Sequence, residues 1–282
     1  MRIPWRPPAG EIVWIGRYPV KSMLGEELGT AVLDETGIDG DRRYALIDER
    51  TGLVASAKNP RKWRTLLTMT ARHDAGGQVA ITLADGTVVR HDDPTADRLL
   101  SGAVGRPVRL AGTRPEGATL ERLTPATEPS PGALTRGSLA AGTPGDTFVD
   151  FAAVHVLTTA TLDALAREHP RHAIDARRFR PNIVVRMYDD VPFSENTWPG
   201  RNLILGAEAT VHVVAPTPRC AVPTLAQGNG LTEDPDVLRT AARVNRVPVL
   251  DLGTLTCVGA YGAVRQGGHL RVGDLVTVTA GP

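Results

Sequence analysis

The first hundred residues alternate apolar and polar positions in short runs. The clearest runs are residues 11–15, 44–47, 78–83 and 87–90. A period of two is typical of strands with one buried face. Turn signals such as Gly76-Gly77 and Asp85-Gly86 separate these runs, and the second of them predicts a hairpin. The pattern predicts a β-rich, antiparallel unit over residues 1–112.

The composition changes between Thr113 and Gly145, where Pro, Gly, Ala, Ser and Thr predominate. Segments of this kind are typical of surface connections. We expect residues 113–147 to form a linker, or a lid over a neighbouring site.

Short strands resume over residues 148–282, with two helices between them. The apolar spacing of Leu162, Leu165 and Ala166 predicts a helix that ends near His169-Pro170, and Asp234-Pro235 is typical of a second helix start. Strands are predicted at 154–157, 183–185, 203–205, 210–214, 270–272 and 275–278. No Gly-x-Gly-x-x-Gly follows a strand, so a dinucleotide-binding fold is not indicated. The expected class is mainly β (α+β), with few helices.

The composition argues against several classes of function. The 282 residues carry a formal net charge of +1 and only 4% aromatic residues, which argues against nucleic-acid binding. No apolar stretch has the length of a membrane helix, and the first eight residues lack the apolar core of a signal peptide. We therefore expect a cytoplasmic protein without a membrane partner.

The chain contains two cysteines, Cys220 and Cys257, which excludes a disulfide framework. Cys257 lies in an apolar run and is expected to be buried packing. Cys220 lies in the proline-rich segment 216–223, beside Arg219. A neighbouring guanidinium favours the thiolate, which attacks electrophiles or binds a soft metal. A small buried side chain at a strand end is the commoner role of a free cysteine, and this segment by itself favours that role.

Histidine spacing does not indicate a zinc site. None of the seven histidines pairs with another at the i, i+4 spacing of a helical zinc site. His169 and His172, at a predicted helix end, are expected at the solvated surface.

Several basic residues have spacings that suit an anionic ligand. Arg180 and Asn182 are two positions apart, so an extended segment would point both to one face. Lys21-Ser22 lies at a turn, and Arg42 follows the Gly40-Asp41 turn. Each group alone is more simply a solvated charge or an ion-pair partner.

Taken in order, these segments resemble the MOSC family, in which a MOSC N-terminal β-barrel domain precedes a MOSC β-barrel domain. The family includes amidoxime-reducing molybdoenzymes and the C-terminal part of molybdenum cofactor sulfurases. The resemblance extends from about Ile12 to Val278 and implies that these two domains occupy residues 1–112 and 148–282. It is carried by Tyr18-Pro-Val-Lys-Ser22, Gly40-Asp-Arg-Arg-Tyr44, Arg178-Phe-Arg-Pro-Asn182, Pro218-Arg-Cys220 and Gly273-Asp274.

The resemblance implies a molybdenum cofactor, that is, molybdopterin carrying molybdenum. It assigns Cys220 as the metal ligand and catalytic centre. It assigns the pterin and its phosphate to Lys21, Ser22, Arg42, Arg180 and Asn182, with Arg219 close by. The chain departs from the family pattern at Pro223–Gln227, which has no acidic residue, and at Phe151-Ala152, where some relatives have a Thr-Ser pair.

The resemblance favours an oxidoreductase that reduces N-hydroxylated small molecules. Two cysteines are too few for a fused iron–sulfur cluster, so electrons would come from a separate protein of the ferredoxin or flavin-reductase type. One alternative is a persulfide-transfer or cofactor-carrier protein that uses Cys220. A weaker alternative is a MOSC scaffold whose cleft serves another small molecule.

Overall fold

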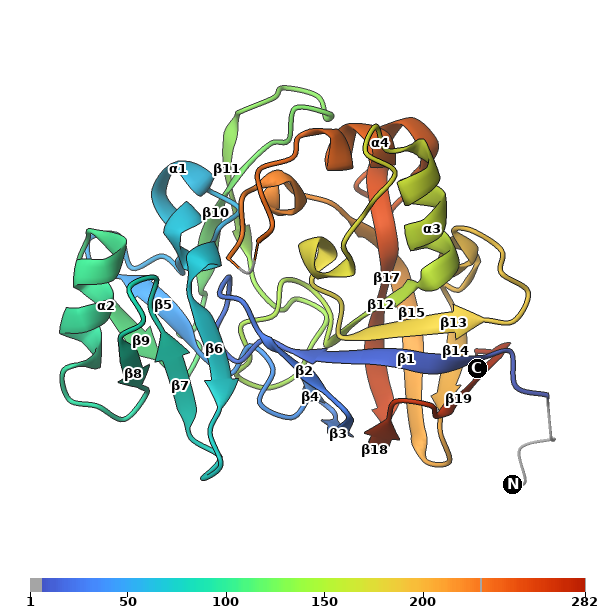
Figure 1. The fold of residues 1–282 in the computed structure, drawn as a ribbon, viewed down its shortest axis with the longest axis horizontal. Helices are drawn as coiled ribbons and strands as arrows, with labels where there is room; N and C mark the ends of the chain where they lie inside the picture. The colour runs from blue at the N-terminus through green and yellow to red at the C-terminus, as the bar shows by residue number, and fades with distance from the viewer. Residues whose placement is uncertain (1–6, 229, 282) are drawn as a thin grey trace.

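In the computed structural model, which describes residues 7–228 and 230–281, the central element is a closed barrel of seven strands (Figure 1). Strand β12 pairs with β13 on one side and with β17 on the other, which closes the ring. The first eight residues were expected to lack a signal peptide, and residues 1–6 of them lie outside the described residues. In ring order the strands are β12 (Val154–Thr158), β13 (Ile183–Met187), β1 (Gly10–Arg17), β19 (Leu275–Ala280), β14 (Arg201–Leu205), β15 (Ala209–Pro218) and β17 (Thr254–Gln266).

The barrel interior is filled by alternate residues of these strands. On β14 and β15, Leu203, Leu205, Val211 and Val213 are buried while their neighbours are less so. Each apolar side chain of this size contributes about 1.5–3 kcal/mol on full burial. The predicted mainly β class is therefore confirmed. The period-two pattern reflects the alternation of buried and exposed side chains along these strands.

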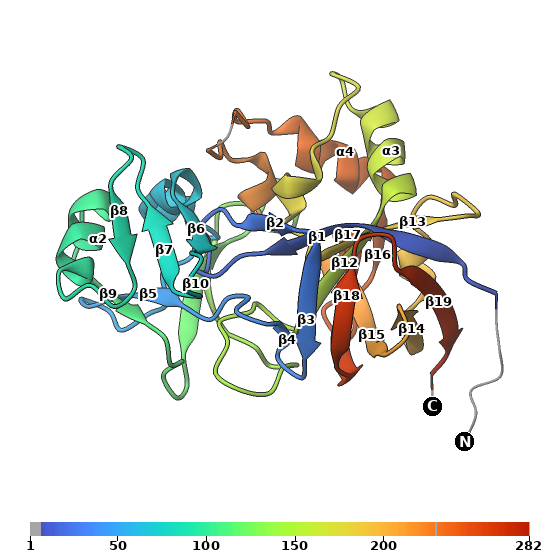
Figure 2. The same cartoon turned by 60° about the horizontal axis from the view of Figure 1, so that its bottom comes forward.

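Strand β1 belongs to this barrel although it comes from the N-terminal unit. It pairs antiparallel with β13 and β19, and its end also pairs antiparallel with β2 (Glu26–Leu28). Strands β3 (Thr30–Asp34) and β4 (Gly37–Ile38) form a sheet with β18 (Gly268–Arg271); Figure 2 shows β3 beside β18. The two units therefore share strands, and the boundaries at residues 112 and 147 stay predictions.

The rest of the N-terminal unit consists of small sheets around a separate core. Its strands and helices are β5 (Ala45–Asp48), α1 (Pro60–Trp63), η1 (Arg64–Thr68), β6 (Thr70–His73), β7 (Val79–Thr82), β8 (Val88–Arg90), α2 (Ala96–Val104) and β9 (Val108–Ala111). The β7–β8 hairpin around Asp85-Gly86 is confirmed. Helix α2 was not predicted, although Gly105 ends it with a φ of 70° and its Leu100 is fully buried.

Part of the expected linker is a β-hairpin. Strands β10 (Thr119–Leu123) and β11 (Leu134–Ser138) pair antiparallel. The reason is that Leu120 is 1% exposed and packs with Ile47, Val54 and Phe148. Burial of β10 therefore anchors this hairpin, whereas β11 is largely exposed and pairs with it.

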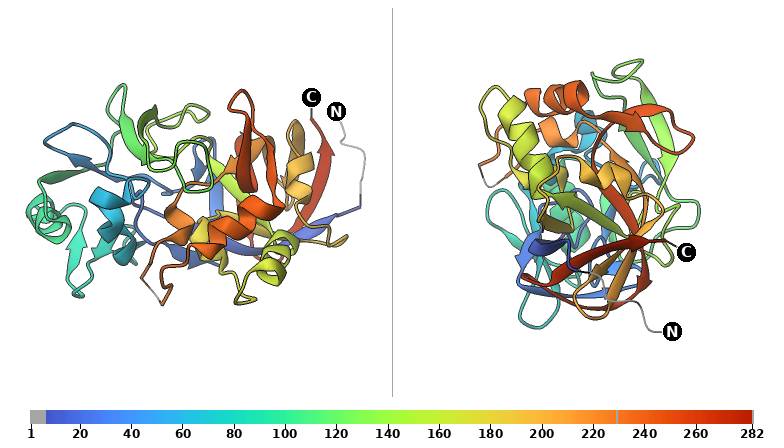
Figure 3. Two further views of the ribbon diagram at one scale, coloured as in Figure 1. Left: turned by 90° about the horizontal axis from the view of Figure 1, so that it is seen from above. Right: turned by 90° about the vertical axis from the view of Figure 1, so that its right-hand side faces the viewer.

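Two helices lie side by side at one end of the barrel (Figure 3). They are α3 (Thr159–Glu168) and α4 (Asp236–Val244), and both predicted helices are confirmed. The Oγ1 atom of Thr158 accepts from the Thr161 amide at 3.1 Å and caps α3. Short turns η2 (Ala176–Phe179), η3 (Ser194–Thr197) and η4 (Val222–Thr224), and strand β16 (Arg246–Pro248), complete this end.

The predicted surface position of His169 is wrong. Its side chain is 1% exposed, and its Nε2 lies 3.2 Å from Asp234 Oδ2, just before α4. The docking of α3 against α4 brings these two groups together, which local sequence does not show. Within residues 7–228 and 230–281, no helix combines the length and apolarity needed to cross a membrane.

Candidate cofactor site

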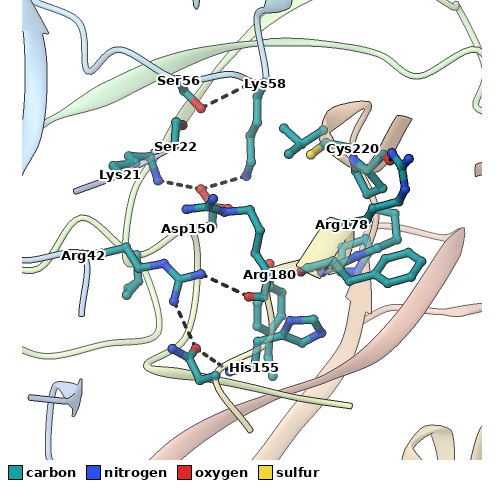
Figure 4. A pocket seen from close by; sticks show the side chains of 18 of the residues that line it. Lys21, Ser22, Arg42, Ser56, Lys58, Asp150, His155, Arg178, Arg180 and Cys220 are labelled. Atoms are coloured by element: carbon teal, nitrogen blue, oxygen red, sulfur yellow. Dashed lines mark hydrogen bonds and ion pairs between the residues drawn. The ribbon is translucent and has the colours of Figure 1, made fainter. Parts of the chain in front are cut away.

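One pocket brings together all seven residues that the sequence assigned to the site. Figure 4 labels five of them, Lys21, Ser22, Arg42, Arg180 and Cys220, which converge from the N-terminal unit and from the barrel. They are Lys21, Ser22, Arg42, Arg180, Asn182, Arg219 and Cys220. The predicted residues thus line one cavity, while the role of each remains a prediction.

The pocket is strongly cationic. Six cations and one carboxylate line it: Lys21, Arg42, Lys58, Arg178, Arg180, Arg219 and Asp150. Burial and the nearby Arg219 hold the pKa of His155 well below its usual value, so this histidine is neutral. Because the whole chain carries only +1, the positive charge is concentrated here and favours an anionic ligand.

Asp150 joins two lysines at the N-terminal side of the pocket. Its Oδ1 lies 2.7 Å from Lys21 Nζ and 2.9 Å from Lys58 Nζ. Burial lowers the pKa of Lys21 to about 8, against the opposing effect of Asp150. Although burial raises the pKa of Asp150, the two ammonium groups hold it well below its usual value. Lys21 therefore titrates near neutral pH and Asp150 stays ionised.

Arg42 and Arg180 both stack on one aromatic ring. Their guanidinium carbons lie 4.4 and 4.3 Å from the centre of the Tyr18 ring. Arg180 also donates to the Met23 carbonyl at 2.7 Å, and Arg42 donates to the Arg180 carbonyl at 3.2 Å. Burial lowers the pKa of Arg180 to about 10, which leaves it charged at neutral pH.

Three of the site residues have left-handed backbone conformations. The φ angles are 66° at Ser22, 46° at Arg42 and 53° at Arg180, a region that non-glycine residues rarely adopt. Each costs about 1 kcal/mol or more and persists because its surroundings hold it. We call four of the cations the cationic cradle: Lys21, Arg42, Lys58 and Arg180. The backbone conformations of the arginines and the ion pairs of the lysines with Asp150 largely fix this cradle before any ligand binds.

Asn182 is committed to contacts within the protein. Its Oδ1 accepts from the His155 amide and from Arg42, each at 3.2 Å, and its Nδ2 donates to the Gly16 carbonyl at 3.2 Å. The side chain is 2% exposed. Asn182 positions Arg42 at the barrel rim, and its assignment as a cofactor ligand stays a prediction.

Cys220 lies between the end of β15 and η4, with a partly exposed thiol on the opposite side of the pocket. Arg178 fixes the following segment by donating to the carbonyls of Pro223 at 3.1 Å and Thr232 at 2.8 Å. Arg219 donates to the Phe179 carbonyl at 3.0 Å. Cys257 is fully buried, which confirms its packing role, and burial raises its pKa to about 12. Cys220 is therefore the accessible thiol of the two.

Sequence reasoning missed Lys58, Asp150, His155 and Tyr261, which also line the pocket. Asp150 directly precedes the Phe151-Ala152 departure and is the carboxylate among the residues that line the pocket. Across the described ranges, no cluster of three or more His, Cys, Asp or Glu side chains is arranged to hold a metal ion.

Two family models match the chain in the expected order. The MOSC N-terminal beta barrel domain matches residues 9–101, and the MOSC domain matches residues 145–277. The chain belongs to the family in which these two domains follow each other. MOSC domains are linked in general with the binding of the molybdenum cofactor.

A search of the curated proteins finds no match. Among solved structures, the YUAD protein from Bacillus subtilis is similar over 97% of both chains, at 11% identity and a TM-score of 0.46.

Proposed function

We propose that this protein binds the molybdenum cofactor between the cationic cradle and Cys220, and uses it to reduce N-hydroxylated small molecules. The observation that carries the proposal is the pairing of an accessible thiol with six cations in one pocket. Charge-assisted donors suit the phosphate of a pterin cofactor, and a thiolate suits a soft metal. A single thiolate supplies only one ligand to a metal ion. The other ligands of a metal bound at Cys220 would therefore come from an organic cofactor.

When bound, the cofactor would supply the two-electron redox chemistry. The reaction breaks the N–O bond of the substrate, takes up two electrons and two protons, and releases the amine or amidine and water. A separate electron-transfer protein of the ferredoxin or flavin-reductase type would supply the electrons.

The chain's own residues would bind and orient the cofactor. The cradle would hold the phosphate, and Cys220 would fix the metal end of the cofactor. Lys21, with a pKa of about 8, is largely charged at neutral pH and adds to the cation set, whereas the ionised Asp150 cannot act as an acid. Asp150 therefore orients the two ammonium groups.

The test compares wild type, Cys220→Ser and Cys257→Ala after expression in a host that makes the cofactor. Plasma mass spectrometry measures molybdenum per chain, and fluorescence after oxidation measures pterin. We expect near-stoichiometric molybdenum in wild type and Cys257→Ala. Loss of a metal ligand should reduce it at least about tenfold in Cys220→Ser, with unchanged circular dichroism.

Equal molybdenum in Cys220→Ser, or none in wild type, would refute cofactor binding through this thiol. Molybdenum that is present but transfers to an apo-enzyme, without reduction of an amidoxime under any supplied reductant, would favour the carrier function. A persulfide trapped on Cys220 would favour sulfur transfer.

A further inference from the structure

A second cavity, of about 400 Å³, adjoins the cofactor pocket. Both are lined by Lys58, Asp150, Pro218, Arg219, Cys220 and Tyr261. Cys220 therefore borders a cationic pocket on one side and a larger chamber on the other. Any group bound in the chamber has access to the same thiol.

One side of the chamber is apolar. Val249, Leu250, Leu252 and Leu255, which we call the leucine wall, lie on the loop between β16 and β17 and at the start of β17. Leu250 and Leu252 are 59% and 61% exposed, although both line a cavity. Exposure of two large apolar side chains at one loop is the pattern expected of a ligand-contacting surface.

The loop is held in a defined shape. The Val249 amide donates to the Gly253 carbonyl at 3.0 Å, and the Leu252 amide donates to the Val249 carbonyl at 2.9 Å. Leu250 has a φ of 47°, which costs energy for a leucine and indicates that the loop is constrained. The leucine wall is therefore a built surface of the chamber.

The β10–β11 hairpin region contributes polar groups to the chamber. Arg122, Thr124, Thr135 and Ser138 line it, together with Glu128 from the connecting loop. Lys58 and Asp150 line both cavities, as Cys220 does, and add charged groups. The chamber thus combines apolar, polar and charged groups with access to the thiol.

An ion pair fastens the hairpin region to the barrel. Glu128 accepts from Thr256 Oγ1 at 2.7 Å and from Arg246 NH2 at 3.0 Å, and Arg246 NH1 donates to the Thr127 carbonyl at 3.0 Å. Although burial raises the pKa of Glu128, these contacts lower it below its usual value. Residues 124–128 are therefore a fixed side of the chamber.

We propose that this chamber binds the organic body of the substrate, and that it selects N-hydroxylated compounds with an aromatic or branched apolar body. The inference rests on the proposed function. The polar N–OH end lies toward Cys220, Lys58 and Asp150, while the apolar body packs on the leucine wall. Leu250 and Leu252 are the specificity-determining residues, because their exposed surface is available to be buried by the substrate.

The test compares two ligands with the same head group, benzamidoxime and acetamidoxime. Ligand-observed NMR titrations measure their dissociation constants for wild type, for the Leu250→Ser/Leu252→Ser double variant and for Val88→Ser. Val88, 59% exposed on β8, is a matched control remote from the chamber. Burial of the phenyl group should make wild type bind benzamidoxime at least about tenfold more tightly than acetamidoxime.

We expect the double variant to lose most of that preference, while its affinity for acetamidoxime and its molybdenum content stay unchanged. The control should behave as wild type. Equal affinity of wild type for both ligands, or an undiminished preference in the double variant, would overturn the proposal.

Binding is measured on protein made in a host that supplies the cofactor, alongside its molybdenum content, so that the two hypotheses fail separately. If wild type contains no molybdenum but shows the leucine-dependent preference, the chamber stands and the proposed function is rejected. If the double variant reduces amidoximes and keeps the preference for benzamidoxime, the proposed function stands and the chamber proposal is rejected.

Discussion

The cationic cradle and the leucine wall flank the same thiol but are built in opposite ways. Cradle side chains are largely buried, bonded to the protein and in part anchored by left-handed backbone. The leucine wall also has a left-handed residue, Leu250, but it presents two apolar side chains that are mostly exposed. The difference indicates that the cradle is preorganised for a constant, anionic ligand, whereas the leucine wall offers apolar surface to the organic group that it contacts.

The largest expected effect comes from removing a cradle cation. Arg180→Met should reduce bound pterin and molybdenum by about 10- to 100-fold, because a charge-assisted hydrogen bond contributes about 1.5–3 kcal/mol. Arg180→Lys should retain part of the binding, since it keeps the charge. Arg186→Met, on the exposed side of β13, is the matched control. Unchanged pterin content in Arg180→Met would show that the cradle does not hold the cofactor.

An intermediate effect is expected from pH. Lys21 has a pKa of about 8, so it is charged below that pH and loses its charge above it. Affinity for sulfate, whose charge is constant in this range, should fall severalfold between about pH 7 and pH 9, because an anion loses one cationic partner. The midpoint shifts upward as the anion itself favours the charged lysine. Isothermal titration calorimetry measures the affinity.

Lys21→Arg is the control for the pH dependence, because it keeps its charge. Its affinity for sulfate should stay nearly flat over the same range. A wild-type profile as flat as that of Lys21→Arg would contradict the assignment of the titration to Lys21. Binding of benzamidoxime should be less sensitive to pH than binding of sulfate, which extends the comparison to the leucine wall.

The smallest effect is expected from Glu128→Gln. Arg246 is one-third exposed (33%), so loss of the ion pair should lower the free energy of unfolding by only about 1 kcal/mol or less. Urea denaturation measures this change. Amide hydrogen exchange should become faster in β10 and β11, because their connection to the barrel is weakened. Unaltered exchange in both strands would mean that Glu128 does not fasten the hairpin.

Much of the barrel could be predicted from local pattern. The alternation in Val211-His212-Val213 and the spacing of Leu162 and Leu165 reflect burial on one face, which local sequence records. The β10–β11 hairpin was missed because its strands lie in a Pro- and Gly-rich segment, where β10 is anchored by burial of Leu120 and β11 by pairing with β10. His169 was misplaced because its partner Asp234 is remote in sequence.

In the site, too, local motifs predicted some residues, whereas residues whose roles depend on distant partners were missed. Short ordered motifs identified Lys21, Arg42, Arg180 and Cys220, and all four line one pocket. Asp150 could not be assigned, because its role depends on two lysines that are distant in the chain. The left-handed conformations of Ser22, Arg42 and Arg180 were equally hidden, since glycine usually signals that backbone region.

The position of β1 has a consequence for how the chain folds. The barrel can close only when β1 meets β13 and β19, which are encoded near the middle and the far end of the sequence. During synthesis β1 must wait for nearly the whole chain, which gives the barrel many nonlocal contacts and predicts slow folding. Until then its apolar side chains need shelter, so nascent chains of this protein are expected to depend on chaperones.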